Sequence, residues 1–579
     1  MRTEDRGGLR VDWQVPIDMD DGVVLRADVY RPRDQEPHPV LITYGPYGKG
    51  LAFQEGYQPQ WEKMAIDHPD ALAGTSNAYA NWEVVDPEKW VPDGYVVIRV
   101  DSRGAGWSEG VMDVWSTREA DDFRQCIEWA AVQPWANGRV GACGVSYYAM
   151  NQWFVAGLQP PSLAAMIPWE GAADYYRDVS YHGGILCQFL GRWFPLQVST
   201  VQNGVGSRGR SNPNTGEPVA GPVDLSDEEL ARNRIEMGLE VKRHPLDDDW
   251  HRSRSADWTR VTVPFLSAAN WGGQGLHPRG NFEAFSSAAS PQKWLEVHGE
   301  THWGPFYSDR ALSLQKRFFD HFLLHSDNGW DREPAVRLQV RHVNRFVERL
   351  EDEWPLARTV WTPLYLDAAN RSLRLDPSDS ASAATYEALG EGLTFLYPAA
   401  ATEMEITGPL AARLFVSSTT SDADLFLVVR LFDADGAEIV FQGALDPNTP
   451  IAQGWLRASH RKLDPELSRP YRPFHTHDES QPLVPGEVYQ LDVEIWPTSI
   501  VVPPEYRLAL TVQGHDYQKE GDLGEFATKF HFASRGCGPF LHADPDDRPA
   551  AVFGGQITLH TGAQFNSHLL VPVIPGRAS

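Results

Sequence analysis

RVGACGVSYY, residues 139–148, is a short apolar run that ends at Gly144-Val145-Ser146. Residues 139–143 have the length and apolarity of a buried strand, and a helix is predicted to follow the serine. A serine at such a strand-to-helix turn is lifted above the edge of a parallel sheet, where a catalytic nucleophile is needed. The last position of the motif is Tyr148 instead of glycine. The motif alone therefore also fits an ordinary serine in a turn.

Working outward, strands and helices alternate through the first half of the chain. Short apolar runs of the buried-strand type recur at residues 39–44, 95–100, 163–167, 263–268 and 294–297. Helical apolar spacing occurs at residues 119–132 and 312–324. This alternation predicts an α/β fold, in which helices cover both faces of a mostly parallel sheet.

The alternation breaks between residues 176 and 257. Residues 203–222 are rich in Gly, Asn and Pro and are predicted to form a loop. Ser226 and Glu229 have the spacing of a capping box, which predicts a helix that ends near His244. Aromatic residues are dense just before the loop. We interpret this segment as a helical cap inserted into the α/β domain.

Beyond residue 327 short strands recur without helices between them, at residues 336–340, 363–366, 412–416, 425–432, 488–495, 506–512 and 556–560. This pattern predicts an antiparallel β-sandwich of the jelly-roll type. The predicted domains are therefore residues 1–175 and 258–327 for the two parts of the α/β domain, 176–257 for the cap and 333–579 for the β domain.

Charge and composition exclude several classes of function. The net charge of −27 opposes contact with phosphate backbones, so no nucleic-acid partner is expected. The N-terminal residues are polar, and no run of about 18 apolar residues occurs, so we expect a cytoplasmic protein that does not contact membranes. The four cysteines show no paired spacing, which predicts buried thiols and no metal site.

The surroundings of Ser146 carry a family resemblance. DSRGAGWSEG at residues 101–110, QPWANG at 133–138 and GVSY at 144–147 closely resemble the cocaine esterase and X-prolyl dipeptidyl-peptidase family, which includes α-amino acid ester hydrolases and glutaryl acylases. EWP at 353–355, TPLYL at 362–366 and PGEVY at 485–489 extend it towards the C-terminus. The resemblance implies an α/β-hydrolase fold with a helical cap insertion and a C-terminal all-β jelly-roll domain, in agreement with the patterns above.

The resemblance also implies a set of site residues. Ser146 is the expected nucleophile, and Tyr47 and the backbone N–H of Tyr147 match the family's oxyanion hole. Such donors stabilise the developing oxyanion. His302, which follows the strand at residues 294–297, matches the family's histidine base better than His298 does.

The acid of the expected triad departs from the family pattern, because Gly273 stands where the family carries an aspartate. The histidine still needs a carboxylate to fix its tautomer. Glu170, at the tip of the strand after the nucleophile helix, is the first candidate, because that tip lies on the same sheet edge as Ser146. Glu300 and Asp174 are weaker candidates.

The leading hypothesis is hydrolysis of a small-molecule ester or amide through an acyl-Ser146 intermediate, with no metal or organic cofactor. Phe189, Trp193, Phe194 and Trp271 are the predicted lining of the substrate pocket. An X-Pro dipeptidyl-peptidase, an acylase or an amino acid ester hydrolase is the alternative within the same fold. A catalytically inactive binding protein is the alternative outside it. The sequence leaves open whether the chain forms a homo-oligomer.

Overall fold

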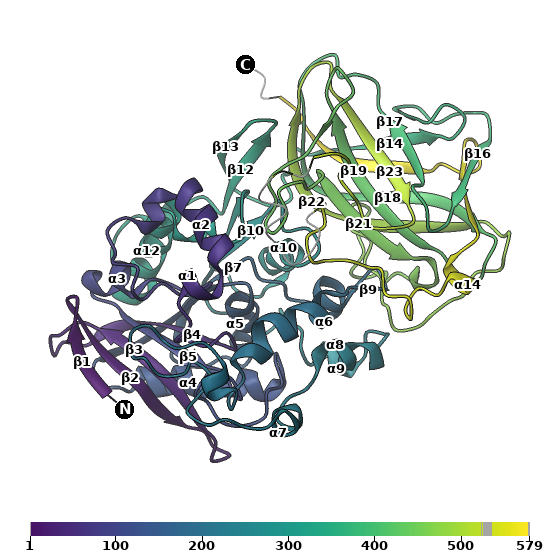
Figure 1. Ribbon diagram of the computed structural model, residues 1–579. Helices are drawn as coiled ribbons and strands as arrows, with labels where there is room; N and C mark the ends of the chain where they lie inside the picture. Colours follow the sequence, from purple (N-terminus) through teal and green to yellow (C-terminus); the bar gives the residue numbers. More distant parts are fainter. Residues whose placement is uncertain (1, 523, 525–534, 577–579) are drawn as a thin grey trace.

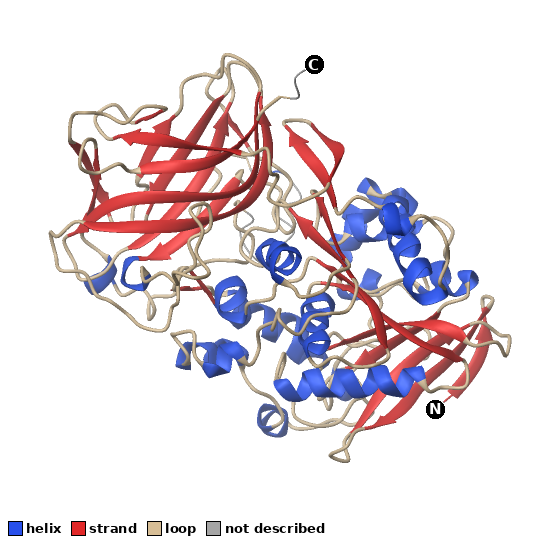
Figure 2. Cartoon of the chain, turned by 180° about the vertical axis from the view of Figure 1, so that it is seen from behind, coloured by secondary structure: helices blue, strands red, loops and turns tan. Residues whose placement is uncertain are grey.

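Two large β-sheets organise the chain, one in each half of the sequence (Figure 1). The computed structural model describes residues 2–522, 524 and 535–576. The first sheet is flanked by helices, whereas the second is almost free of them (Figure 2). The alternating first half and the strand-rich second half therefore correspond to two different architectures, as the sequence predicts.

The first sheet is parallel in its centre. In spatial order its strands are β1 (Arg2–Arg6), β2 (Leu9–Asp18), β3 (Val24–Arg31), β5 (Val96–Asp101), β4 (His38–Gly45), β6 (Ala136–Val145), β7 (Leu163–Trp169), β10 (Phe265–Asn270), β11 (Lys293–His298), β12 (Val336–His342) and β13 (Arg345–Glu351). Neighbours from β5 to β12 pair in parallel, and the remaining strands pair antiparallel at the two edges. The carboxyl ends of β6, β7, β10 and β11 consequently share one edge, where ligands bind in open α/β sheets.

Helices cover both faces of this sheet. α4 (Thr117–Ala131), α5 (Tyr147–Gly157) and α10 (Pro278–Ser287) bury residues in one core cluster. α3 (Pro87–Trp90) and α12 (Asp309–Leu324) contribute to the cluster on the opposite face. α12 begins at its N-cap Ser308, whose hydroxyl accepts from the N–H of Ala311, and it buries one apolar stripe as its spacing predicts. Shorter helices flank this part of the chain: α1 (Phe53–Gly56), α2 (Gln58–Asp67) and α11 (Gly304–Tyr307).

The segment between β7 and β10 is built from short elements. They are the π-helical turns Tyr175–Ser180 and Phe194–Val198, the hairpin of β8 (Tyr181–His182) and β9 (Ile185–Leu186), and the helices α6 (Phe189–Trp193), α7 (Asp227–Arg232), α8 (Met237–Glu240) and α9 (Asp249–Arg252). The capping box at Ser226 is confirmed. The prediction of one helix to His244 is wrong, because the chain leaves helical geometry after α7 and exchanges backbone hydrogen bonds with Met112.

The second sheet closes on itself. In spatial order its strands are β16 (Ser382–Glu387), β24 (Gln556–Thr561), β18 (Met404–Ser418), β22 (Tyr489–Val502), β21 (Ala452–Arg457), β19 (Asp424–Phe432), β23 (Arg507–Gln513), β17 (Leu393–Leu396), β15 (Ser372–Arg374), β14 (Val360–Asp367) and β25 (His568–Ile574), with β20 (Glu438–Ile439) beside β19 and the helix α14 (Ala550–Phe553) outside the sheet. β25 pairs with both β14 and β18, which closes the ring around one apolar core.

β12 and β13 lie in a different sheet from the one we expected. Residues 336–340 were predicted as the first strand of the β domain, but β12 pairs in parallel with β11 and extends the first sheet. An isolated apolar strand carries no signal for the sheet it joins, which tertiary packing decides. Among the described residues, no helix combines the length and the apolarity needed to cross a membrane.

Candidate active site

Ser146 lies at a strained turn between β6 and α5. Its backbone has φ 59° and ψ −112°, outside the regions that non-glycine residues normally adopt. The turn brings Tyr148 so close that a Cβ on Gly144 would lie 2.5 Å from the Tyr148 Cβ, so glycine is required there. Within residues 141–150 Ser146 alone keeps intermediate exposure, and its neighbours are buried. This geometry is that of a nucleophile elbow.

The group that contacts the Ser146 hydroxyl is His277. Its Nε2 lies 3.0 Å from Ser146 Oγ. His277 is buried and directly precedes Pro278, the first residue of α10, at the end of the loop that follows β10. The distance is that of a hydrogen bond through which a histidine can take the serine proton. Sequence reasoning did not select this residue.

His302, the predicted base, contacts two carboxylates instead. Its Nδ1 lies 2.8 Å from Glu170 Oε2, as expected for the Glu170 hypothesis. Its Nε2, however, lies 3.0 Å from Glu83 Oε1 and is therefore engaged away from Ser146. The His302 ring stacks on the His277 ring, with centroids 4.8 Å apart and planes inclined by 9°. The structure thus places His277 between Ser146 and the pair of Glu170 and His302.

Glu170 occupies the centre of this group. It follows β7, has a left-handed backbone (φ 53°) and is fully buried. Its Oε1 accepts from Asn270 Nδ2 and His298 Nε2, both at 3.1 Å. The His277 Nδ1 lies 4.0 Å from Glu170 Oε2 and has no hydrogen-bond partner among the described residues. Glu170 is therefore the carboxylate towards which the free ring nitrogen of His277 is directed.

The two stacked histidines differ in charge. Burial alone would lower the pKa of His302, but Glu170 and Glu83 outweigh it and raise the pKa to about 10. Burial and the neighbouring charge of His302 lower the pKa of His277 to about 3. Near neutral pH His302 is an imidazolium ion and His277 is neutral. Of the two, only His277 can accept a proton from Ser146 in this state.

The carboxylates differ as well. Burial opposes ionisation of Glu170, but the charge of His302 and the hydrogen bond from His298 prevail and lower its pKa to about 2. Burial raises the pKa of Glu83 to about 7 in spite of its contact with His302. Glu170 therefore remains ionised, while Glu83 can exchange a proton near neutral pH.

Two hydrogen-bond donors come from Tyr147, the residue after Ser146, and from Tyr47, whose ring lies 5.9 Å from the Tyr147 ring. Tyr47 is buried, and its Oη accepts a hydrogen bond of 3.0 Å from Trp193 Nε1, which leaves its own O–H free to donate to another group. Burial raises the pKa of Tyr47 well above its usual value, so the phenol keeps its proton. Tyr147 is the first residue of α5, and its backbone N–H has no acceptor within the helix. The Tyr147 side chain is a structural element that donates to Glu119 and stacks on Trp115.

Known proteins similar to this chain are hydrolases. Residues 21–304 match the family described as X-Pro dipeptidyl-peptidase (S15 family), and residues 328–570 match the X-Pro dipeptidyl-peptidase C-terminal non-catalytic domain. A solved CocE/NonD family hydrolase from Staphylococcus aureus is 32% identical, covers 98% of this chain and 94% of its own, and has a TM-score of 0.83. The chain belongs to the CocE/NonD hydrolase family.

Two curated proteins are also similar to this CocE/NonD chain over most of its length. The cocaine esterase of a Rhodococcus species is 27% identical over 98% of this chain and 99% of that protein. A putative serine esterase of Mycobacterium tuberculosis is 26% identical over 86% of this chain and 90% of that protein. The resemblance inferred from the residues around Ser146 is confirmed, as is the prediction that the chain is an enzyme of the hydrolase class.

The predicted pocket residues of this CocE/NonD hydrolase separate into two groups. Phe189, Trp193 and Phe194 are buried in the same cluster as Tyr47, and the Trp193 and Phe189 rings stack with centroids 5.8 Å apart. Trp271 instead is fully buried in another cluster, where its Nε1 donates to Gln339 O at 2.8 Å and its ring lies beside Phe282. The structure therefore does not bring Trp271 to the cluster around Tyr47, because its ring and its indole N–H are both used in the core.

The two weaker acid candidates are engaged elsewhere. Glu300 Oε2 pairs with His68 Nε2 at 2.9 Å, and Asp174 Oδ2 pairs with Arg177 at 2.8 Å.

The sequence analysis missed two residues of the site, Glu83 and His277. Glu83 lies in a loop, and its backbone carbonyl accepts a hydrogen bond from the N–H of Val145. Its left-handed backbone, with φ 65°, cannot be recognised from the sequence. His277 carried one signal, since it lies in the loop in which the family places its acid. Glu170, His277 and His302 also form a group whose ligand atoms lie within 4.8 Å of one another, close enough to hold a metal ion.

Proposed function

We propose that this chain hydrolyses carboxylic esters through an acyl-enzyme formed on Ser146, with His277 as the general base and Glu170 as the carboxylate that supports it. The observation that carries the proposal is the 3.0 Å contact between Ser146 Oγ and a neutral His277 Nε2 at a nucleophile elbow. Relatives named serine esterase and cocaine esterase favour an ester substrate.

Acylation begins with attack of Ser146 Oγ on the ester carbonyl carbon. His277 Nε2 takes the hydroxyl proton as the new bond forms. The carbonyl oxygen becomes an oxyanion, which the Tyr47 O–H and the Tyr147 backbone N–H stabilise. When the tetrahedral intermediate collapses, the bond to the leaving oxygen breaks and His277 returns its proton to the departing alcohol. Water then attacks the acyl group by the same route and regenerates Ser146.

In this mechanism His302 is a positioning residue. His277 becomes a cation during each proton transfer, beside the imidazolium ring of His302. Glu170 is ionised next to both rings and offsets this charge. Glu83, with a pKa of about 7, can accept the Nε2 proton of His302 and remove one of the two positive charges. The pair of Glu83 and His302 thereby controls how easily His277 is protonated.

At the level of domains, we propose that residues 1–175 and 258–327, together with β12 and β13, form an α/β-hydrolase domain, with residues 176–257 as its helical cap and the strands from β14 onward as a jelly roll. The parallel strand order from β5 to β12 and the nucleophile after β6 support the first assignment. The closed ring of β14–β25, antiparallel except where β15 meets β17, supports the last.

A second candidate is an X-Pro dipeptidyl-peptidase, because both matching family descriptions carry that name. Amide hydrolysis uses the same Ser146 and His277 but requires protonation of a poorer leaving group. The contact between Ser146 and His277 speaks against an inactive binding protein.

Labelling and substrate panels test these proposals together. A fluorophosphonate probe is expected to label the wild-type chain and not Ser146→Ala. The wild-type chain should hydrolyse p-nitrophenyl esters, and Ser146→Ala should lower kcat by at least about 10⁴-fold. Faster turnover of X-Pro p-nitroanilides than of any ester would favour the peptidase. Near wild-type turnover by pure Ser146→Ala protein would exclude Ser146 as the nucleophile.

A further inference from the structure

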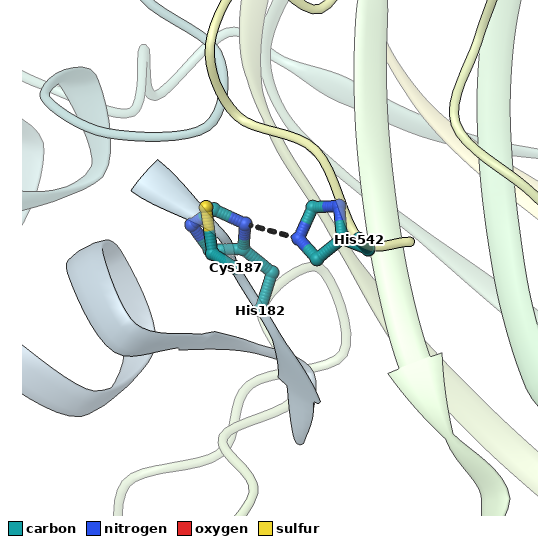
Figure 3. A group of neighbouring side chains, drawn as sticks. All are labelled: His182, Cys187 and His542. Carbon is teal, nitrogen blue, oxygen red and sulfur yellow. Dashed lines mark hydrogen bonds between the residues drawn. The ribbon is translucent and has the colours of Figure 1, made fainter. Parts of the chain in front are cut away.

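A second cluster of potential ligands lies between the cap and the β domain (Figure 3). It consists of His182 on β8, Cys187 directly after β9, and His542 in the segment that leads to α14. All three side chains are buried, and their ligand atoms lie within 4.8 Å of one another. Figure 3 shows a nitrogen of each imidazole ring directed at the other ring, with the Cys187 sulfur drawn over the His182 ring. The sequence gives no spacing signal, because His542 is 360 residues from His182.

The outer nitrogens of both rings are already used. His182 Nε2 lies 3.2 Å from the carbonyl oxygen of Asp178, which can only accept, so the proton of His182 resides on that nitrogen. His542 Nδ1 lies 2.7 Å from the Asp516 carboxylate and donates to it. Metal-binding histidines in proteins are held in the same way, by a carbonyl or a carboxylate on the far ring nitrogen.

The inner nitrogens therefore present their lone pairs to a shared position. His182 Nδ1 and His542 Nε2 are 2.7 Å apart, a distance that needs a cation or a single shared proton between them. The thiol of Cys187 adds a soft ligand at the same place.

We propose that His182 Nδ1, His542 Nε2 and Cys187 Sγ bind one thiophilic divalent transition-metal ion, with Zn²⁺ as the reference ion. Tetrahedral Zn²⁺ with bonds of about 2.0–2.1 Å to nitrogen places two nitrogens about 3.3 Å apart, so the rings need to separate by only about 0.6 Å. A cavity of about 290 Å³, lined by Cys187, Lys242 and Asp544 among others, reaches the cluster on its Cys187 side.

The ion would join the cap to the β domain, and a neighbouring residue of the β domain packs on the loop of His277. β8 and β9 belong to the cap, and His542 belongs to the β domain. Phe540 packs against Gly275 so tightly that a Cβ on this glycine would lie 2.9 Å from the Phe540 Cβ. Gly275 is part of the loop that ends in His277. The site is therefore structural, and this inference does not depend on the proposed esterase activity.

Cobalt provides the direct test, because a Co²⁺–thiolate bond gives an intense charge-transfer band in the near ultraviolet. The full chain is stripped with a chelator and titrated with Co²⁺ or Zn²⁺. One ion per chain, the cobalt–thiolate band and a rise of a few degrees in Tm are expected. Cys187→Ser should lose the band and the rise. Cys126→Ser, which removes a buried thiol in α4 far from the cluster, should keep both.

Three results would overturn the proposal: no metal bound to the wild-type chain, binding without the cobalt–thiolate band, or a band that survives in Cys187→Ser. The second result would indicate the sulfur-free group of Glu170, His277 and His302. The wild-type titration decides the matter even when Cys187→Ser does not fold. Loss of ester turnover alone would bear on the proposed function and not on this site.

Discussion

At the scale of single residues, the identity of the base depends on charge as much as on distance. Both His277 and His302 lie near Glu170, but His302 holds a proton on each nitrogen between two carboxylates. A histidine in that state has no lone pair for the Ser146 proton. His277 is neutral, and its Nε2 is 3.0 Å from Ser146 Oγ.

Replacing each histidine in turn separates their roles. His277→Ala is expected to lower kcat for a p-nitrophenyl ester by about 10³–10⁴-fold, because the base is removed. His302→Gln should lower it by only about 10–10²-fold, because Ser146 and His277 remain. The measurement is steady-state kinetics on folded variants, checked by circular dichroism. The opposite order of effects would restore His302 as the base.

The pH profile gives an independent check. A base acts in its deprotonated form, so a His277 pKa of about 3 keeps it active as the pH falls. We therefore expect kcat/KM not to show the roughly tenfold fall between pH 7.5 and 5.5 that an ordinary histidine base would give, and any smaller change in this range to follow Glu83, whose pKa is about 7.

His302→Gln supplies the matched comparison for that profile. It removes the positive charge beside His277, so the pKa of His277 should rise and the acidic limb should move to higher pH. An ordinary fall near pH 6.5 in the wild-type chain, unchanged in the variant, would contradict the assigned charges.

The residues that could be predicted are those fixed by local geometry. Ser146 follows from a strand, a glycine and a helix in sequence, and the contact of Glu170 with His302 follows from parallel strands that end at one edge. His277 could not be predicted, because its loop takes its shape from the β domain. A Cβ on Gly272 would lie 2.3 Å from the Cα of Gly443. This close approach explains the glycine at position 272, whereas a Cβ on Gly273, where the family carries its acid, would lie 3.1 Å from Pro278 Cδ.

At the scale of elements, the cap reaches the proposed oxyanion hole through a stack of aromatic rings. Trp193 on α6 stacks on Trp115 at 5.0 Å and donates its indole N–H to Tyr47 Oη at 3.0 Å. A phenol that accepts a hydrogen bond becomes a better donor, since hydrogen-bonded chains polarise one another. The cap aromatics therefore act on Tyr47 as well as on any pocket they line.

Tyr47→Phe and Trp193→Phe test this coupling. Tyr47→Phe should lower kcat by about 10²–10³-fold with little change in KM, because it removes a donor to the oxyanion. Trp193→Phe should lower kcat by about threefold to tenfold through the lost N–H alone. Phe189→Leu is the control, since it disturbs the stack and keeps the hydrogen bond. A rise in KM alone for Tyr47→Phe would make Tyr47 a substrate-binding residue.

Elements were predicted best where periodicity is long. α4 and α12 agree with their predicted ranges within three residues, because each has a capped start and one apolar stripe. The helix expected to reach His244 failed because residues 233–235 pair with Met112, a partner more than 100 residues away. Such pairing leaves no local trace.

At the scale of the whole molecule, the β domain holds both histidine loops. The carbonyl of Ala444 accepts from the His302 N–H at 2.9 Å, and the Ala444 N–H donates to Gly272 O at 3.0 Å. One residue of the domain named non-catalytic in the family therefore fixes the backbone on either side of the site. We infer that the β domain is needed to assemble the active site.

Arg279 makes the same connection through charge, two residues after His277. Its guanidinium donates to Asp178 Oδ1 of the cap at 3.0 Å and to Glu494 on β22 at 3.1 Å, and the side chain is almost fully buried. Removing one partner of a buried ion pair leaves an uncompensated charge. Arg472 also joins α10 to the β domain, through Glu283, but its side chain is 18% exposed against 3% for Arg279, so its removal should cost less.

Arg279→Met is therefore expected to lower the free energy of unfolding by about 3–5 kcal/mol, and Arg472→Met is expected to lower it clearly less. Because α10 begins directly after His277, Arg279→Met should also lower kcat, while Arg472→Met should not. Denaturant unfolding and ester kinetics on both variants make the comparison. Equal costs would mean that the buried ion pairs of Arg279 do not hold the three parts together. If Arg279→Met lost the expected free energy of unfolding but kept its kcat, the loop of His277 would keep its shape without these ion pairs.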